Sequence, residues 1–291
     1  MPPDMPMSHA RRMILVLVSL LVAGAAQPSA QSQGETSHPP ADREARALLK
    51  AICPEGMRTH HLGERLYVAC QPCPDFTSRA LTRAGRRDFF NLETVIYGSF
   101  TVAGAREAIG GFLGCEDHTT TANFRGSVLL RKGPHGWRKI AYERYETSQC
   151  RDYRLPGGRD VLLCQGLMGH ADESAAWVFT YDFADPEGQN ERDLFGVINT
   201  WGACGATAIV GSIDKFELRD LDHDGMPDVS IHATVIEEEA SGPQGVCAAD
   251  FSPPPGKTYQ IDFLFQQGKF VVAPWSAEMK HTLDETFKAA R

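Results

Sequence analysis

The chain lacks a long apolar segment of the kind that crosses membranes. The uncharged apolar run at residues 13–23 has eleven residues, whereas a helix needs roughly 20 to span a bilayer. Two arginines precede this run and three small residues, 24–26, follow it. That order is typical of a secretory signal peptide. We therefore expect residues 1–26 to be a signal peptide cleaved after Ala26 or, as a second choice, after Ala30. An uncleaved N-terminal anchor is the alternative, and we expect no stable membrane span after processing.

Basic residues are fewer than acidic ones, and the sequence motifs of common enzyme classes are absent. The 29 Lys and Arg residues are outnumbered by 37 Asp and Glu, for a net charge of −8. No basic stripe is present, so nucleic acid is not an expected partner. The sequence has no Gly-x-Ser-x-Gly elbow, P-loop, dinucleotide fingerprint or metalloprotease helix motif. We therefore expect a protein that is not an enzyme, whose partner is an unknown extracellular protein or glycan.

Behind the signal peptide, the composition predicts a leader and one domain. Residues 27–41 are rich in Gln, Ser, Pro and Gly and lack apolar periodicity, which predicts a disordered leader. Residues 42–291 are long enough for a single large β domain. Apolar spacing predicts a short helix at 42–51, capped by Asp42. A second helix is expected from residue 276 to the C-terminus.

Most of the domain is predicted to form short strands. Apolar runs separated by Gly and Pro lie at 127–130, 137–142, 161–164, 177–183, 229–233, 259–265 and 269–273. Residues 133–136 and 266–268 are expected hairpin turns. Many short strands with this punctuation predict a mainly β fold, such as a sandwich, barrel or propeller.

The cysteines predict a disulfide-stapled domain. An even number of cysteines behind an export signal indicates disulfides. The eight are Cys53, Cys70, Cys73, Cys115, Cys150, Cys164, Cys204 and Cys247. A turn at 156–158 favours a Cys150–Cys164 bridge, worth roughly 3 kcal/mol in the chain-entropy model. Cys204–Cys247 would enclose the acidic loop described below. The first four cysteines would then form two bridges among themselves.

A C-x-x-C pair gives the alternative function. Cys70 and Cys73 follow a strand-like run and precede a possible helix at 77–84. That order resembles a thioredoxin-like active site, in which a helix N-terminus activates the first cysteine. The alternative function is therefore an exported thiol–disulfide oxidoreductase. Nearby Cys53 and the lack of alternating strands and helices favour a structural disulfide instead.

A cluster of aspartates predicts a calcium site. Carboxylates stand at positions one, three, five and nine of a loop: Asp220, Asp222, Asp224 and Asp228. They repel one another unless a cation neutralises them, and calcium accepts 6–8 oxygen ligands in flexible geometry. Gly225 permits a sharp turn, and the Met226 carbonyl would supply a main-chain oxygen. Asp228 would complete the shell where the next strand begins.

The loop differs from an EF-hand. Its twelfth position is Ile231, where an EF-hand needs a bidentate Glu. The flanking residues are strand-like, and magnesium prefers fewer protein ligands. The competing interpretation is a solvated acidic turn, since Asp and Gly are ordinary turn residues.

Two weaker copies of the loop suggest an internal repeat. The segment DLDHDGMPDVSI from residue 220 aligns without gaps to SFTVAGAREAIG from residue 99 and to DYRLPGGRDVLL from residue 152. All three share a Gly at position six and an acid at position nine. The repeat loops therefore lie near 99–109, 152–163 and 220–231, and repeated β-units of propeller-blade size are expected.

The aspartate loop resembles the calcium loops of FG-GAP/VCBS-type repeats, which occur in integrin-like propellers. The resemblance covers about a dozen residues and extends faintly to the two weaker copies, which have lost most carboxylates. It implies a propeller-like array of β-hairpin repeats with a structural Ca²⁺ ion; a β-sandwich is the alternative. It also implies extracellular recognition or adhesion by a secreted, periplasmic or cell-envelope protein.

Overall fold

The computed structural model of the chain describes residues 35–62, 65–77, 89–115, 125–143, 149–169, 174–185, 191–200, 207–239 and 255–289. The predicted signal peptide lies outside these residues. So do Cys204 and Cys247, and with them the predicted bridge between these two cysteines.

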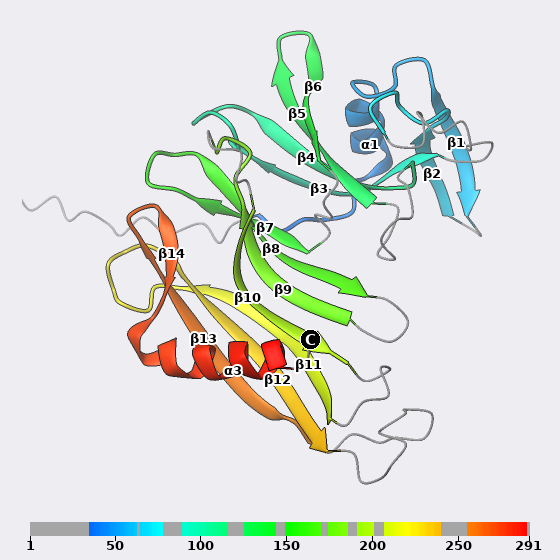
Figure 1. Cartoon of the computed structure of the whole chain (residues 1–291). Coiled ribbons are helices and arrows are strands. Elements are labelled where there is room, and N and C mark those ends of the chain that lie inside the picture. Colours follow the sequence, from blue (N-terminus) through cyan, green and yellow to red (C-terminus); the bar gives the residue numbers. More distant parts are fainter. Residues whose placement is uncertain are drawn as a thin grey trace, which may run out of the picture. The chain divides into compact units, whose positions relative to one another are not determined.

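The fold is mainly β, as the sequence predicted, and consists of two antiparallel sheets (Figure 1). The first sheet follows chain order and contains β1 (Met57–Leu62), β2 (Arg65–Cys70), β3 (Phe90–Gly98), β4 (Glu107–Leu113), β5 (Arg125–Gly133) and β6 (Gly136–Glu143). The second also follows chain order and contains β7 (Cys150–Arg154), β8 (Asp160–Gly169), β9 (Ser174–Tyr181), β10 (Glu191–Asn199), β11 (Thr207–Arg219), β12 (Asp228–Glu239), β13 (Lys257–Gln266) and β14 (Lys269–Val272).

Both predicted hairpin turns are present. Gly133 pairs with Gly136 at the end of β5 and β6, and Gln266 pairs with Lys269 at the end of β13 and β14. The second turn needs positive φ at both central residues, which are Gln267 (51°) and Gly268 (84°). Such turns match the twist of the flanking strands and fix their register.

Both predicted terminal helices are also present. Helix α1 (Asp42–Leu49) buries Leu48 and Leu49 in the core of the first sheet. Helix α3 (Ala277–Ala289) follows the short 3₁₀ helix η1 (Pro274–Ser276), and its Leu283 and Phe287 join the core of the second sheet. None of the helices in the described residues is long and apolar enough to cross a membrane.

The two sheets share a core and a bridging segment. Ile96, Ile109 and Leu129 of the first sheet pack with Leu162 and Phe179 of the second. Residues 35–38, which we call the bridging segment, add backbone pairing to both sheets. Within it, His38 pairs with Val95 of β3, and Thr36 pairs with Arg151 of β7.

This pairing corrects the prediction of a disordered leader at residues 35–38, whereas residues 27–34 of that leader lie outside the described chain. Residues 35–38 belong to the expected disordered leader, yet the described chain there donates and accepts backbone hydrogen bonds with both sheets. The reason is that β7 is an edge strand and the Val95 side of β3 lies beyond its short pairing with β2. Open edges present unpaired backbone N–H and C=O groups. An extended segment can hydrogen-bond to these groups through its own backbone, even when its side chains are polar.

The predicted propeller is not confirmed. A blade is a four-stranded sheet, whereas the described strands form continuous sheets of six and eight strands. Short local repeats of a loop do not determine where one sheet ends and the next begins.

Candidate metal-binding loop

The predicted acidic loop joins β11 to β12. Arg219 and Asp228 are the last residue pair of this hairpin, so residues 220–227 form the connection. Strands flank the loop on both sides. This setting matches the strand-like flanks expected from the sequence and differs from the helix–loop–helix of an EF-hand.

Three of the predicted ligands converge. Asp220, Asp222 and Asp224 each offer a carboxylate oxygen, and these oxygens all lie within 4.8 Å of one another. Asp222 and Asp224 are exposed and Asp220 is partly buried. The chain turns sharply within the loop, with positive φ at His223 (63°) and Gly225 (88°).

The loop's own amides hold the three side chains in place. The Asp224 amide donates to Asp222 Oδ1 (3.2 Å), and the Gly225 amide donates to Asp220 Oδ2 (3.2 Å). The Met226 amide donates to Asp224 Oδ1 (2.7 Å). Each carboxylate therefore keeps at least one oxygen for another partner.

Negative charge in the loop has little compensation. No Lys, Arg or His among the described residues forms an ion pair with Asp220, Asp222 or Asp224. Asp220 Oδ1 is buried and has no hydrogen-bond partner there. A buried carboxylate oxygen without a partner is costly, so the arrangement can accept a cation at low reorganisation cost.

Asp228 differs from the other three. Its side chain is buried, with Oδ2 accepting the Leu221 amide (2.8 Å) and Oδ1 accepting the Phe265 amide (2.8 Å). Burial raises the pKa of this carboxyl, and the two amide hydrogen bonds oppose that shift. Asp228 does not belong to the group within 4.8 Å. It ties the start of the loop to β13, and its role as a ligand stays a prediction.

Tyr153 contacts the end of the loop, a role that the sequence analysis did not predict. Its hydroxyl donates to the Pro227 carbonyl (2.7 Å). Its ring packs against Phe265 (5.0 Å) and Phe270 (4.9 Å), and the Met226 side chain packs against the same cluster. Burial first, then the charges of Asp228 and Asp224, raise the pKa of Tyr153. The available sequence signal was its place beside Asp152, in the second repeat copy.

The loop at 99–106 resembles the aspartate loop in structure. Each has eight residues between strands and a glycine at positive φ in position six, Gly104 or Gly225. In each, the ninth residue begins the next strand, is buried and accepts an amide from the start of its loop. For Glu107 that amide belongs to Thr101 (2.8 Å).

The copy from residue 152 fits less well. Asp152 lies within β7, the connection covers only residues 155–159, and the positive φ falls on Gly158 instead of Gly157. Its ninth residue, Asp160, is nevertheless buried and accepts the Ser99 amide (2.7 Å). The shared feature is thus a buried acid at a strand start that holds backbone amides.

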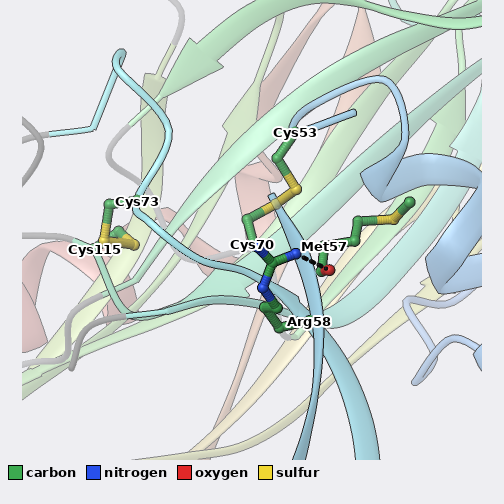
Figure 2. Close-up of a disulfide and its surroundings, with 6 residues drawn as sticks. All are labelled: Cys53, Met57, Arg58, Cys70, Cys73 and Cys115. Carbon is green, nitrogen blue, oxygen red and sulfur yellow. Dashed lines mark hydrogen bonds between the residues drawn. A yellow bond between two sulfur atoms is a disulfide. The ribbon is translucent and has the colours of Figure 1, made fainter. Parts of the chain in front are cut away.

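The structure pairs six of the cysteines. Cys150 and Cys164, the predicted pair, lie opposite each other on β7 and β8 and form a disulfide. The other two bridges are Cys53–Cys70 and Cys73–Cys115 (Figure 2).

Cys70 and Cys73 do not bond to each other. Figure 2 shows their sulfurs in separate bridges, and Cys70 is fully buried in the core of the first sheet, where it pairs with Met57 of β1. A C-x-x-C redox centre cycles through a disulfide between its own two cysteines, so this arrangement gives the oxidoreductase interpretation no support.

Comparison with known proteins adds no relative. The sequence matches no known protein family, and no curated protein or solved structure shows significant similarity to the chain.

Proposed function

We propose that this chain is an exported, non-enzymatic β-protein in which the loop at residues 220–228 binds calcium as a structural ion. The observation that carries the proposal is the convergence of three aspartate oxygens within 4.8 Å on a tight β-hairpin connection. Its biological role would be recognition or adhesion outside the cell or in the cell envelope. Three disulfides favour such a location, because disulfides persist in oxidising compartments.

Calcium fits this donor set better than other ions. The set consists of carboxylate oxygens, with no His or Cys among the three residues, and hard oxygen donors suit calcium or magnesium over zinc. Two of the three side chains are exposed, so water would complete the shell. The longer, more flexible coordination of calcium tolerates such a loop, whereas magnesium demands near-ideal octahedral geometry.

We also propose that the FG-GAP/VCBS-type resemblance applies to two hairpin loops of this chain. The loops at 99–106 and 220–227 would be two copies of one FG-GAP/VCBS-type hairpin unit, of which only the second retains the metal ligands. Their equal length, glycine position and buried ninth acid support that relation. A complete propeller-like array is not needed for it.

Thermal unfolding with and without calcium tests the ion. Extracellular calcium modules bind at about 10⁻⁴–10⁻³ M, and a concentration ten times the Kd adds about 1.4 kcal/mol. For a domain of this size, we expect Tm to rise by about 3–6 °C with 10 mM CaCl₂ relative to EDTA.

Matched variants separate ion binding from general charge effects. Asp222→Asn/Asp224→Asn keeps side-chain size and turn hydrogen bonding but should abolish the calcium-dependent rise. Asp284→Asn, at an exposed carboxylate of α3, should leave the rise intact. Equal rises in wild type and the double variant, or equal effects of calcium and magnesium, would contradict the proposal.

A further inference from the structure

A second feature involves Phe265, which is tied to Asp228, but does not use the carboxylates of Asp220, Asp222 and Asp224. A cavity of about 490 Å³ lies between the β13–β14 hairpin, the loop before β8 and the facing parts of β9 and β10. We call it the hairpin cavity. Its volume falls in the range of roughly 300–1,000 Å³ that small-molecule sites occupy.

One wall of the hairpin cavity is apolar. It is formed by Leu155, Val161, Leu194, Phe265 and Phe270. The two phenylalanine rings are 5.2 Å apart and are backed by Tyr153. Phe265 is further fixed by the hydrogen bond from its amide to Asp228. Val161, Leu194 and Phe265 are buried and Leu155 and Phe270 are half-buried, so the apolar surface that a ligand would meet is chiefly that of Leu155 and Phe270.

The charged groups of the hairpin cavity are not all neutralised. Arg159 is satisfied, because both of its terminal nitrogens bind Asp182 and one also donates to the Phe100 carbonyl. Arg192 donates to Asp185 (2.8 Å) through one nitrogen, and its side chain is 52% exposed. A guanidinium has five N–H donors, so several donors of Arg192 have no partner among the residues that the structure describes.

Lys269 contributes a second exposed positive charge. It follows the tight turn at Gln267 and Gly268, is exposed, and forms no ion pair with any residue that the structure describes. Asp193 is the one lining carboxylate not already bound to an arginine in that part of the chain. The hairpin cavity thus offers more free hydrogen-bond donors than acceptors beside an apolar wall.

We propose that the hairpin cavity binds a small amphipathic monocarboxylate. The carboxylate would accept hydrogen bonds from Lys269 and Arg192, and the aliphatic or aromatic body would lie on Phe270 and Leu155. A cation of the same shape would face two positive groups and only one free carboxylate. A neutral apolar molecule would leave the Lys269 ammonium without a charge partner.

Isothermal titration calorimetry on the mature chain tests this site. The probes are sodium octanoate and octyltrimethylammonium chloride, which share an eight-carbon chain and differ in the sign of the head group. We expect octanoate to bind with a Kd of about 1 mM or tighter and the ammonium to bind at least tenfold more weakly.

Two charge-reversal variants locate the binding. Lys269→Glu should weaken octanoate at least tenfold, and Lys269→Gln should have an intermediate effect. Lys257→Glu makes the same change at the opposite end of β13, is also exposed and should change the Kd less than twofold. Unchanged melting temperatures of all three variants would show that folding is intact.

The outcomes are distinct from those of the calcium proposal. No octanoate binding, equal binding of both probes, or equal weakening by Lys257→Glu and Lys269→Glu would overturn the assignment. Neither lysine belongs to the acidic loop, so the calcium-dependent rise in Tm should persist in the Lys269 variants. A protein that binds octanoate but not calcium would refute the metal site and leave the hairpin cavity standing.

Discussion

At the scale of single residues, buried acids at strand starts are the recurring feature. Glu107, Asp160 and Asp228 are each almost fully buried and each accepts a backbone amide from a hairpin connection. A carboxylate is a strong acceptor, and charge-assisted hydrogen bonds are roughly twice as strong as neutral ones. These acids therefore act as fixed anchors for loops, and they account for the sequence repeat without requiring metal at every copy.

Asp152 gives a residue-scale prediction about pH. Burial first, then the charge of Asp160, raises the pKa of Asp152 to about 6. The pKa of Asp152 in the folded state is above the ordinary value of 3.8, so the folded state favours the protonated carboxyl. The stabilising contribution of protonated Asp152 is complete below about pH 4 and is lost as the pH rises through 6. Asp152→Asn should remove this loss and raise the unfolding free energy by about 1–2 kcal/mol at pH 7.5.

Urea unfolding at pH 4.5 and pH 7.5 checks the prediction. The gain from Asp152→Asn should be larger at the higher pH. Asp284→Asn, which removes an exposed carboxylate, should show no such difference. A gain that is equal at both pH values would assign the effect to packing and not to ionisation.

At the scale of elements, the bridging segment is the least expected piece. In this segment the Ser37 amide donates to the Cys150 carbonyl (2.9 Å), and the His38 amide donates to the Val95 carbonyl (3.0 Å). Composition alone suggested disorder, because residues 27–41 are rich in Gln, Ser, Pro and Gly and lack apolar periodicity. The pairing depends on edges supplied by distant strands, which no local pattern can reveal.

Proline substitutions test whether this pairing stabilises the fold. Ser37→Pro and His38→Pro each remove one bonded backbone N–H, together with the Ser37 Oγ that accepts the Cys150 amide and the His38 ring beside Glu35 and Glu44. Each should cost about 1–3 kcal/mol in urea unfolding. Thr36→Pro is the matched control, because its N–H makes no backbone hydrogen bond among the described residues. Equal losses at all three positions would mean that proline geometry, not hydrogen bonding, sets the effect.

At the scale of the whole molecule, the disulfides differ in what they constrain. Cys73–Cys115 joins residues 42 apart in the chain, whereas Cys150–Cys164 joins residues 14 apart that already face each other across β7 and β8. In the chain-entropy model the longer loop is worth ~4 kcal/mol and the shorter ~3 kcal/mol.

The double variant Cys73→Ser/Cys115→Ser should therefore lower the unfolding free energy more than Cys150→Ser/Cys164→Ser. Guanidinium unfolding of both variants under non-reducing conditions gives the comparison. The reverse order would indicate that the β7–β8 hairpin depends on its bridge more than on the pairing around it.

Sequence reasoning reached the mainly β class, the two helices and about half of the described strands (β5, β6, β8, β9, β12, β13 and β14), because apolar runs and turn residues are local signals. One of the strands that it missed is β4, whose Gly110 and Gly111 suggest a turn. A Cβ at Gly110 would approach Leu92 Cδ1 to 2.5 Å, so the buried Leu92 side chain packs into the space that the glycine leaves. The roles of Asp228 and Tyr153 were also out of reach, since Phe265 and Pro227 lie 37 and 74 residues away from them.

The bridging segment has a consequence for the order of folding. His38 can pair once Val95 has emerged, whereas Ser37 must wait for Cys150, which is 113 residues further along. During synthesis, residues 35–37 therefore lack their partner strand until half of the chain has emerged, and this extended stretch is an open template for strands of other molecules. A nascent chain stalled before residue 150 should thus tend to associate with other chains through residues 35–37, and emergence of β7 should end that tendency.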